Sequence, residues 1–244
     1  MQFIREKHVA ARLPADGETR IWRYMDLWKF ESLVNSQALY LCRGGKLQDR
    51  FEGTWPHQQR ASEDSWLESI GRADLIQKER VSRELRRKRF FVSCWCMNEH
   101  DLDLMWKAYT SDSQSVAIQS TVDRLVAVAD EAIGQWPIDV STVAYIDYAA
   151  GVHINNVDGF DAFVHKDVHF KLDSEIRIIH WPNIQEPVPD GILLPVKLST
   201  LIEKITFHPG SRLQLRDDLR ALLEKAGLSG ICCEASRDHR DVIY

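Results

Sequence analysis

Cysteine is scarce in this chain and follows no recognised pattern. The 244 residues contain five cysteines, and no two of them have the Cys-x-x-Cys spacing that is typical of zinc and redox sites. No spacing among them predicts a disulfide framework, so we expect reduced thiols in a cytoplasmic protein. The nine histidines add no zinc ligand set at a recognised spacing, and the sequence therefore predicts no metal site.

Long hydrophobic runs are also missing. The opening residues, "MQFIREKHVAARLPADGE", alternate charged and apolar groups, which predicts no secretory signal, and no later run is long enough to span a bilayer. We therefore expect no membrane association. The net charge is -5, so any attraction to nucleic acid needs a local basic patch.

The sequence has none of the compact motifs that identify common enzyme classes. It contains no GxSxG motif for a serine nucleophile, and "CRGGKLQDR" lacks the GxxxxGK[ST] pattern that wraps phosphates ahead of a helix. It has no internal repeat and no low-complexity segment. Function must therefore be sought in residues that are dispersed along the chain.

The composition is that of a globular protein. Hydrophobic residues make up 44% and charged residues 27%, which predicts one domain over residues 1–244, with residues 1–19 as an N-terminal extension. Residues 57–89 are polar and helix-favouring around Gly71, which predicts an insertion of two exposed helices. From Lys78 to Arg89, seven basic residues face two acids; this run is typical of a solvated helix face, and the alternative is contact with a phosphate backbone.

Apolar spacing predicts the remaining elements. A helix capped by Asp26 carries Leu27, Phe30, Leu33 and Val34 on one face, and a later helix is capped by Thr121. Strands are predicted at "LYLC", "FFVSCWC", "SVAIQS" and "GICCEAS", and in residues 140–148, 175–181, 192–196 and 202–207. The order lacks regular βαβ alternation, so we expect an α+β fold with a mixed or split β-sheet flanked by helices.

Three segments concentrate residues that packing alone would not select. The first is Trp22-Arg23-Tyr24 with the loop "KLQDRFEG", which contributes Asp49 and Glu52. The second is a helical face with Leu102, Met105, Trp106 and Tyr109 at i, i+3, i+4 and i+7. The third contains Glu175 and Arg177, which project from the same side of a predicted strand. Taken singly, each is also explained by core packing or an ordinary ion pair.

Together these segments resemble the domain-of-unknown-function 2971 family of bacterial proteins over about residues 20 to 240. The family has a Tyr-Arg-Tyr start, a Phe-Asn-Asp-Pro-Phe-Glu loop, a Met-Trp-x-x-Tyr helix and a late Glu-x-Glu-x-Arg segment preceded by Lys and Trp. The corresponding stretches here are "WRY", "LQDRFE", "MWKAY" and "DSEIR", with Lys166 and Phe170 before the last. Gln48, Arg50, Phe170 and Asp173 depart from the family pattern.

The order of these elements is also similar to the ADP-ribosyltransferase superfamily, which splits a mixed sheet around an NAD cleft. This resemblance implies a transferase acting on NAD, such as a toxin or phage-defence effector, with a nucleic acid or protein acceptor. In this interpretation Glu175, Arg177 and Tyr109 are catalytic. Arg23 binds the pyrophosphate, clamped by neighbouring rings, and Tyr24, Trp106, Asp49 and Glu52 complete the cofactor site.

Two other interpretations are open. In the first, Asp49, Glu52, Asp173 and Glu175 gather divalent cations in a metal-dependent nuclease. In the second, the protein is a non-catalytic module that binds a phosphorylated ligand or nucleotide. Such a module would have a ligand-sized pocket that contains Arg23 but lacks a carboxylate near the reacting position. The sequence predicts no particular oligomeric state.

Overall fold

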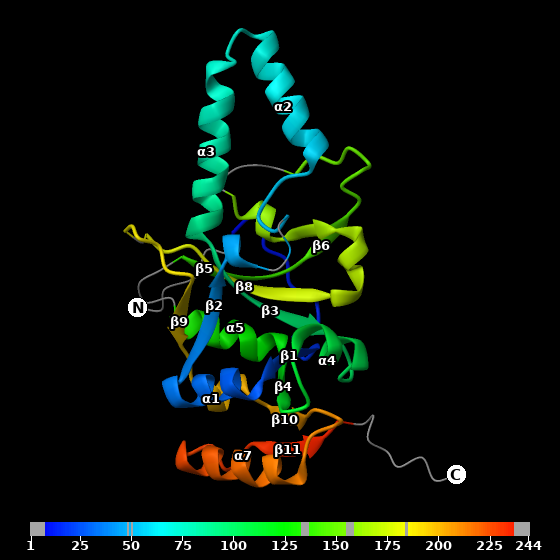
Figure 1. Cartoon of the computed structure of the whole chain (residues 1–244), viewed down its shortest axis with the longest axis vertical. Coiled ribbons are helices and arrows are strands. Elements are labelled where there is room, and N and C mark those ends of the chain that lie inside the picture. The colour runs from blue at the N-terminus through cyan, green and yellow to red at the C-terminus, as the bar shows by residue number, and fades with distance from the viewer. Residues whose placement is uncertain are drawn as a thin grey trace, which may run out of the picture. The chain divides into compact units, whose positions relative to one another are not determined.

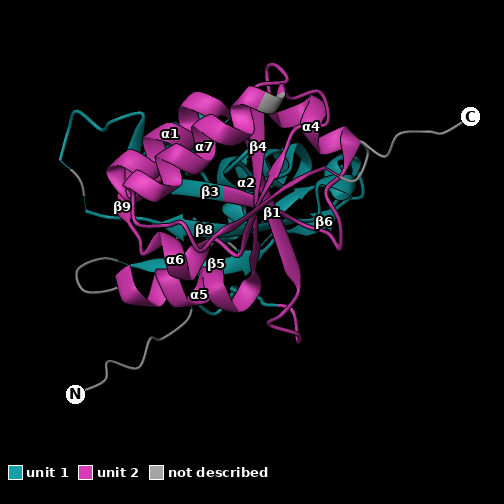
Figure 2. Cartoon of the chain, turned by 90° about the horizontal axis from the view of Figure 1, so that it is seen from below, with its two compact units in different colours: residues 1–13, 41–93, 133–192 teal, residues 14–40, 94–132, 193–244 magenta. Residues whose placement is uncertain are grey.

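The computed structural model describes residues 8–47, 49, 51–132, 137–154, 159–183 and 185–236, and it has an α+β fold with a mixed sheet flanked by helices (Figure 1). The chain divides into two compact units, each built from three separate segments (Figure 2). Unit 1 comprises residues 1–13, 41–93 and 133–192, and unit 2 comprises residues 14–40, 94–132 and 193–244. The predicted α+β class with a mixed sheet flanked by helices is confirmed, whereas the ADP-ribosyltransferase-like fold and the single domain stay predictions.

Unit 2 contains the mixed part of the sheet. Strand β1 (Arg20–Asp26) pairs antiparallel with β4 (Ser115–Thr121), and β4 pairs antiparallel with β10 (Lys204–Phe207). Strand β10 then pairs parallel with β11 (Cys232–Ala235). The end of β3 (Phe91–Met97) adds to β1 through the register of Trp22 with Cys96.

The helices of unit 2 lie in two packed pairs beside these strands (Figure 2). Helix α1 (Leu27–Ser36) packs against α7 (Leu213–Lys225), and α5 (Val122–Glu131) packs against α6 (Leu198–Leu201). The short helix α4 (Asp103–Tyr109) contacts β1. Helices α1, α5 and α7 each bury an apolar face.

Unit 1 contains a second antiparallel strand pair. Strand β8 (Glu175–His180) is buried along its whole length and pairs with β5 (Ile138–Thr142). Strands β2 (Ala38–Arg43) and β9 (Gly191–Pro195) belong partly to this unit, and β2 pairs with β3 at Cys42 and Val92. Strand β6 (Ala144–Ile146) lies within the strand predicted over residues 140–148 and pairs parallel with β7 (His165–Asp167), which was not predicted from the sequence. The described part of this unit also contains the short 3₁₀ helices η1 (Gly44–Lys46), η3 (Asp161–Phe163) and η4 (Val168–Asp173).

The two helices expected in residues 57–89 are present. Helix α2 (His57–Ser69) and helix α3 (Asp74–Arg89) are joined by a turn at Gly71, whose φ is 71°. Figure 1 shows this hairpin, in cyan, extending away from the strands of the same unit. Helix α3 has no buried residue, so the prediction of exposed helices is confirmed.

The two predicted helix caps have different outcomes. Thr121 caps α5, because its side chain accepts a hydrogen bond from the backbone N–H of Arg124. Helix α1 begins directly after Asp26, and Phe30, Leu33 and Val34 are buried as expected. The side chain of Asp26, however, makes no capping bond and accepts hydrogen bonds from Ser111 instead. Sequence spacing therefore located helix α1 correctly, but the hydrogen-bond partner predicted for the Asp26 carboxylate was wrong.

Among the described residues, no helix is both long enough and apolar enough to cross a membrane. The first seven residues of the predicted N-terminal extension lie outside the described part of the chain, as do Gln48 and Arg50 of the predicted loop.

Candidate functional site

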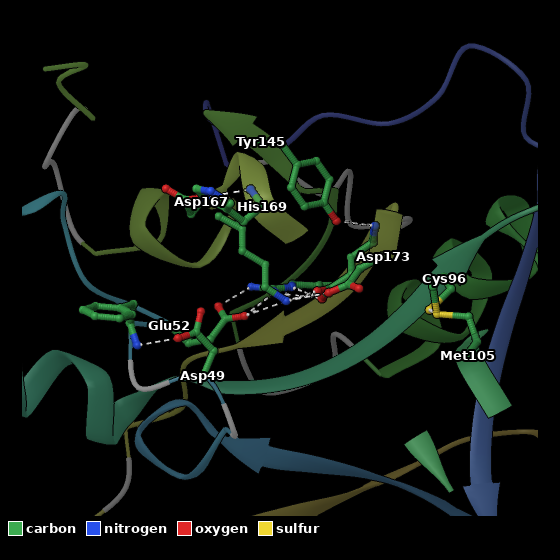
Figure 3. Close-up of polar contacts among 12 residues, drawn as sticks. Asp49, Glu52, Cys96, Met105, Tyr145, Asp167, His169 and Asp173 are labelled. Carbon is green, nitrogen blue, oxygen red and sulfur yellow. Dashed lines mark hydrogen bonds and ion pairs between the residues drawn. The ribbon is translucent and has the colours of Figure 1, made fainter. Parts of the chain in front are cut away.

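Five charged residues of unit 1 form a connected group, which we call the ionic cluster (Figure 3). Its members are Glu52, Lys166, Asp173, Glu175 and Arg177. Arg177 is completely buried and binds both carboxylate oxygens of Glu52, at 2.9 Å and 2.7 Å. Its Nε also donates to Glu175 at 2.8 Å, and its Nη1 donates to the backbone oxygen of Phe163 at 2.8 Å. One guanidinium therefore joins two acids that are far apart in sequence.

Lys166 holds the other side of the cluster. Its Nζ lies 2.7 Å from Oε1 of Glu175 and 2.8 Å from Oδ2 of Asp173. The ammonium also lies 4.4 Å from the ring centroid of Phe170, within the range of a cation–π contact. Both oxygens of Glu175 are thus occupied by cations, one from β8 itself and one from β7.

The local sequence explains how the acids reach Arg177. Glu175 and Arg177 are two residues apart on β8, so their side chains point to the same side of the strand. Glu52 is presented by a tight turn in which its N–H donates to the backbone oxygen of Asp49. Gly53 follows at φ 67°, where an added Cβ would lie 2.3 Å from the ring of Phe163. Only glycine fits this left-handed position beside the ring.

Asp49 has a structural role in this turn. Its carboxylate accepts a hydrogen bond from the N–H of Phe51, at 2.9 Å (Figure 3). This short contact is typical of an Asx turn, in which a side chain replaces a backbone acceptor. Asp49 was predicted to bind cofactor; the described contacts show it shaping the loop that carries Glu52.

The cluster shifts the pKa values of Glu175 and Lys166. Burial raises the pKa of the Glu175 carboxyl, but the charges of Arg177 and Lys166 outweigh burial and lower the pKa to about 2. Burial lowers the pKa of Lys166, and the surrounding carboxylates raise it above its usual range. Burial raises the pKa of the Tyr145 hydroxyl, which accepts a hydrogen bond from the backbone N–H of Glu175 (Figure 3).

The charges of the cluster do not cancel. Three carboxylates face two cations, which leaves one net negative charge in a largely buried group. The side chain of Asp173 is 21% exposed, whereas those of Glu52 and Glu175 are 4% and 2% exposed. Asp173 is therefore the carboxylate through which this charge reaches solvent.

The aromatic residues predicted to bind cofactor belong to unit 2. Trp106 is 1% exposed, and its ring packs edge to face against Tyr24 with 4.9 Å between centroids. The indole N–H of Trp106 donates to Asp101, and the hydroxyl of Tyr24 accepts from the backbone N–H of Leu102. Both rings thus belong to a hydrophobic core, which also contains the neighbouring pair Cys96 and Met105 (Figure 3). Tyr109 packs against this core and remains partly exposed.

Arg23 lies on the other side of β1 from its neighbours Trp22 and Tyr24. Its guanidinium lies 5.8 Å from the ring centroid of Trp95 and donates to the backbone oxygen of Tyr40 at 3.0 Å. Trp22 and Tyr24 instead join the core around Trp106. The expectation that these two rings clamp Arg23 overlooked strand alternation, because successive side chains of a strand point to opposite faces.

The structure connects only part of the predicted site. In unit 1, Arg177 contacts both Glu52 and Glu175, whereas Arg23, Tyr24, Trp106 and Tyr109 belong to unit 2. A single cleft lined by both sets stays a prediction. Lys166 was not predicted as a site residue, although the resemblance already aligned it with a family position.

Within the described ranges, no three His, Cys, Asp or Glu side chains are grouped so that they could hold a metal ion. Comparison with known proteins adds no family assignment. No protein-family model matches the chain, and no curated protein shows significant similarity to it.

Proposed function

We propose that this protein is an ADP-ribosyltransferase-like enzyme that acts on NAD, and that the ionic cluster supplies negative charge to the reacting ribose. The observation that supports the proposal is the net negative charge of a cluster whose central carboxylate, Glu175, has a pKa of about 2. Loss of nicotinamide from NAD creates an oxocarbenium-like centre. A fixed carboxylate stabilises that charge most where it develops, in the transition state.

We assign different tasks to the acids of the cluster. Glu175 is enclosed by Arg177 and Lys166, so we assign it as the positioning residue that fixes the charge and the conformation of the group. Asp173 shares Lys166 with Glu175 and is the most exposed carboxylate, so we assign the contact with ribose to Asp173. This assignment modifies the interpretation from sequence, in which Glu175 itself meets the substrate.

The same contacts make the nuclease alternative less favourable. Each cluster acid already shares oxygens with Lys166 or Arg177, so a divalent cation would have to displace a buried cation before it could bind. Breaking such an ion pair leaves an uncompensated charge in a poorly solvated environment. The contacts therefore favour chemistry that uses the carboxylates as fixed charges.

The test measures nicotinamide release from NAD in the presence of protein, DNA or RNA acceptors. We expect the wild type to release nicotinamide and Asp173→Asn to lower kcat at least tenfold while retaining the wild-type unfolding midpoint. Glu175→Gln serves as a second variant, whose folding is checked by circular dichroism. An exposed acid on the same unit, Asp190→Asn, is the control. Absence of release by the wild type with every acceptor would remove the proposal, and full activity of Asp173→Asn would remove the assigned role of Asp173.

A further inference from the structure

The helical hairpin of α2 and α3 buries very little of its own surface. Helix α3 has no buried residue over its 16 positions, and α2 buries only Gln59 and Leu67. Helices in proteins derive most of their stability from packing an apolar face against a neighbour. A pair of helices that buries so little surface lacks the packing contacts from which helices usually gain their stability.

Two ion pairs join the two helices. Arg80 binds Asp64 and Arg83 binds Glu63, both at 2.9 Å. Arg80 is 61% exposed, so solvent screens its pair and the contribution to stability is small. These pairs join α2 to α3 across the hairpin.

Each helix also exposes a hydrophobic pair. On α2 and the residue that ends it, Trp66 and Ile70 are 60% and 49% exposed; on α3, Val81 and Leu85 are 47% and 40% exposed. Within each pair the residues are four apart, so both side chains lie on one helical face. We call these four residues the hairpin patch. Exposed tryptophan surrounded by polar residues is typical of protein interfaces.

The two helices carry opposite charge. Helix α2 has three acids and one arginine, whereas α3 has seven basic residues and three acids. A further helix packing on α3 is therefore favoured when it is acidic, and one packing on α2 is favoured when it is basic. A second copy of the hairpin would provide both the acidic helix that suits α3 and the basic helix that suits α2.

We propose that the hairpin patch forms the interface of a homodimer, in which α2 of one copy packs against α3 of the second copy. A twofold axis repeats the same contact, so each hairpin provides one acidic and one basic helix. The result is a four-helix bundle that buries both hydrophobic pairs. A nucleic acid would satisfy the basic residues of α3 but would leave Trp66 and Ile70 uncovered.

The test measures the mass of the full chain by sedimentation equilibrium over a range of concentrations. We expect twice the chain mass of 28.2 kDa for the wild type, and a dissociation constant at least tenfold higher for Trp66→Ser and for the double variant Val81→Ser with Leu85→Ser. Trp28→Ser is the matched control, because Trp28 is 64% exposed and lies outside the hairpin. Circular dichroism confirms that each variant is folded.

Two results would overturn the homodimer. One is a wild type that remains at 28.2 kDa at about 100 µM, where a weak dimer would be populated by mass action. The other is a dimer that Trp66→Ser and the double variant leave as stable as the wild type. A monomer that binds duplex DNA, and loses binding in Lys88→Gln, would assign the hairpin to nucleic acid instead.

Discussion

Arg177 and Glu52 form a bidentate ion pair across 125 residues of sequence, with N–O distances of 2.9 Å and 2.7 Å. Arg177 is completely buried and also binds Glu175. Its removal would leave two buried carboxylates without their shared cation. The pair therefore compensates charge that is buried inside unit 1.

We predict that Arg177→Met lowers the free energy of unfolding by about 3–5 kcal/mol, because it leaves buried charge uncompensated. Urea denaturation measures the loss. The double variant Glu52→Leu with Arg177→Met should recover part of it, since one stranded carboxylate is removed. Arg72→Met, which breaks the exposed pair with Asp74, should leave the midpoint unchanged. An Arg177→Met midpoint equal to that of the wild type would contradict the prediction.

Stability should fall in acid because of Glu175. Its pKa is about 2 in the folded protein and near 4.5 when unperturbed, so the unfolded chain binds the proton more readily. The stabilisation is present above the unfolded pKa and is lost as pH falls towards the folded pKa. Urea midpoints measured between about pH 5 and pH 2 should decline more steeply for the wild type than for Glu175→Gln. If the urea midpoints of the two proteins decline equally with falling pH, Glu175 is not the source of the loss of stability in acid.

Two glycines with similar backbone angles should respond differently to alanine. Gly53 has a φ of 67° and Gly71 a φ of 71°. A Cβ added at Gly53 would lie 2.3 Å from the ring of Phe163, whereas a Cβ added at Gly71 would have no neighbouring atom within 4 Å. Gly71→Ala should cost only the backbone strain, about 1–2 kcal/mol. Gly53→Ala should cost about 1–3 kcal/mol more because it also overpacks the turn. Equal unfolding free energies for the two variants would disprove the role of the contact with Phe163.

The cysteines should differ in their rates of thiol labelling. Cys232 is exposed, Cys96 is 5% exposed, and burial raises the pKa of Cys233, which lowers its thiolate fraction. With a disulfide reagent at neutral pH, we expect Cys232 to react first and Cys96 last. Cys232→Ser should abolish the fastest phase. Persistence of that phase in the variant would assign it to another thiol.

Sequence periodicity predicted most helices and strands because their apolar spacing is local information. The faces of α1 and α4 were identified correctly from residues three and four apart. The partners of charged residues could not be found in this way. Glu52 and Arg177 are 125 residues apart, and Asp26 and Ser111 are 85 residues apart. Such pairs depend on which strands and loops become neighbours, and one sequence does not specify this.

The candidate site illustrates the same limit. The shared face of Glu175 and Arg177 followed from the period of a strand, and the same period should have separated Arg23 from Trp22 and Tyr24. Lys166 carries no local signal of its own, because its role arises from the pairing of β7 with β6 and from the turn before β8. Burial of Trp106 could not be distinguished from a ligand platform by helical spacing alone.

The interleaving of the two units constrains how the chain can fold while it is being synthesised. Unit 1 takes its last segment from residues up to 192, so the ribosome must make most of the chain before Glu52 can meet Arg177. A truncation that ends anywhere before Arg177 leaves that carboxylate without its guanidinium. Neither unit can therefore be expressed as a contiguous fragment. In the nascent chain, the turn that carries Glu52 gains its ion pair only after Arg177 has been synthesised.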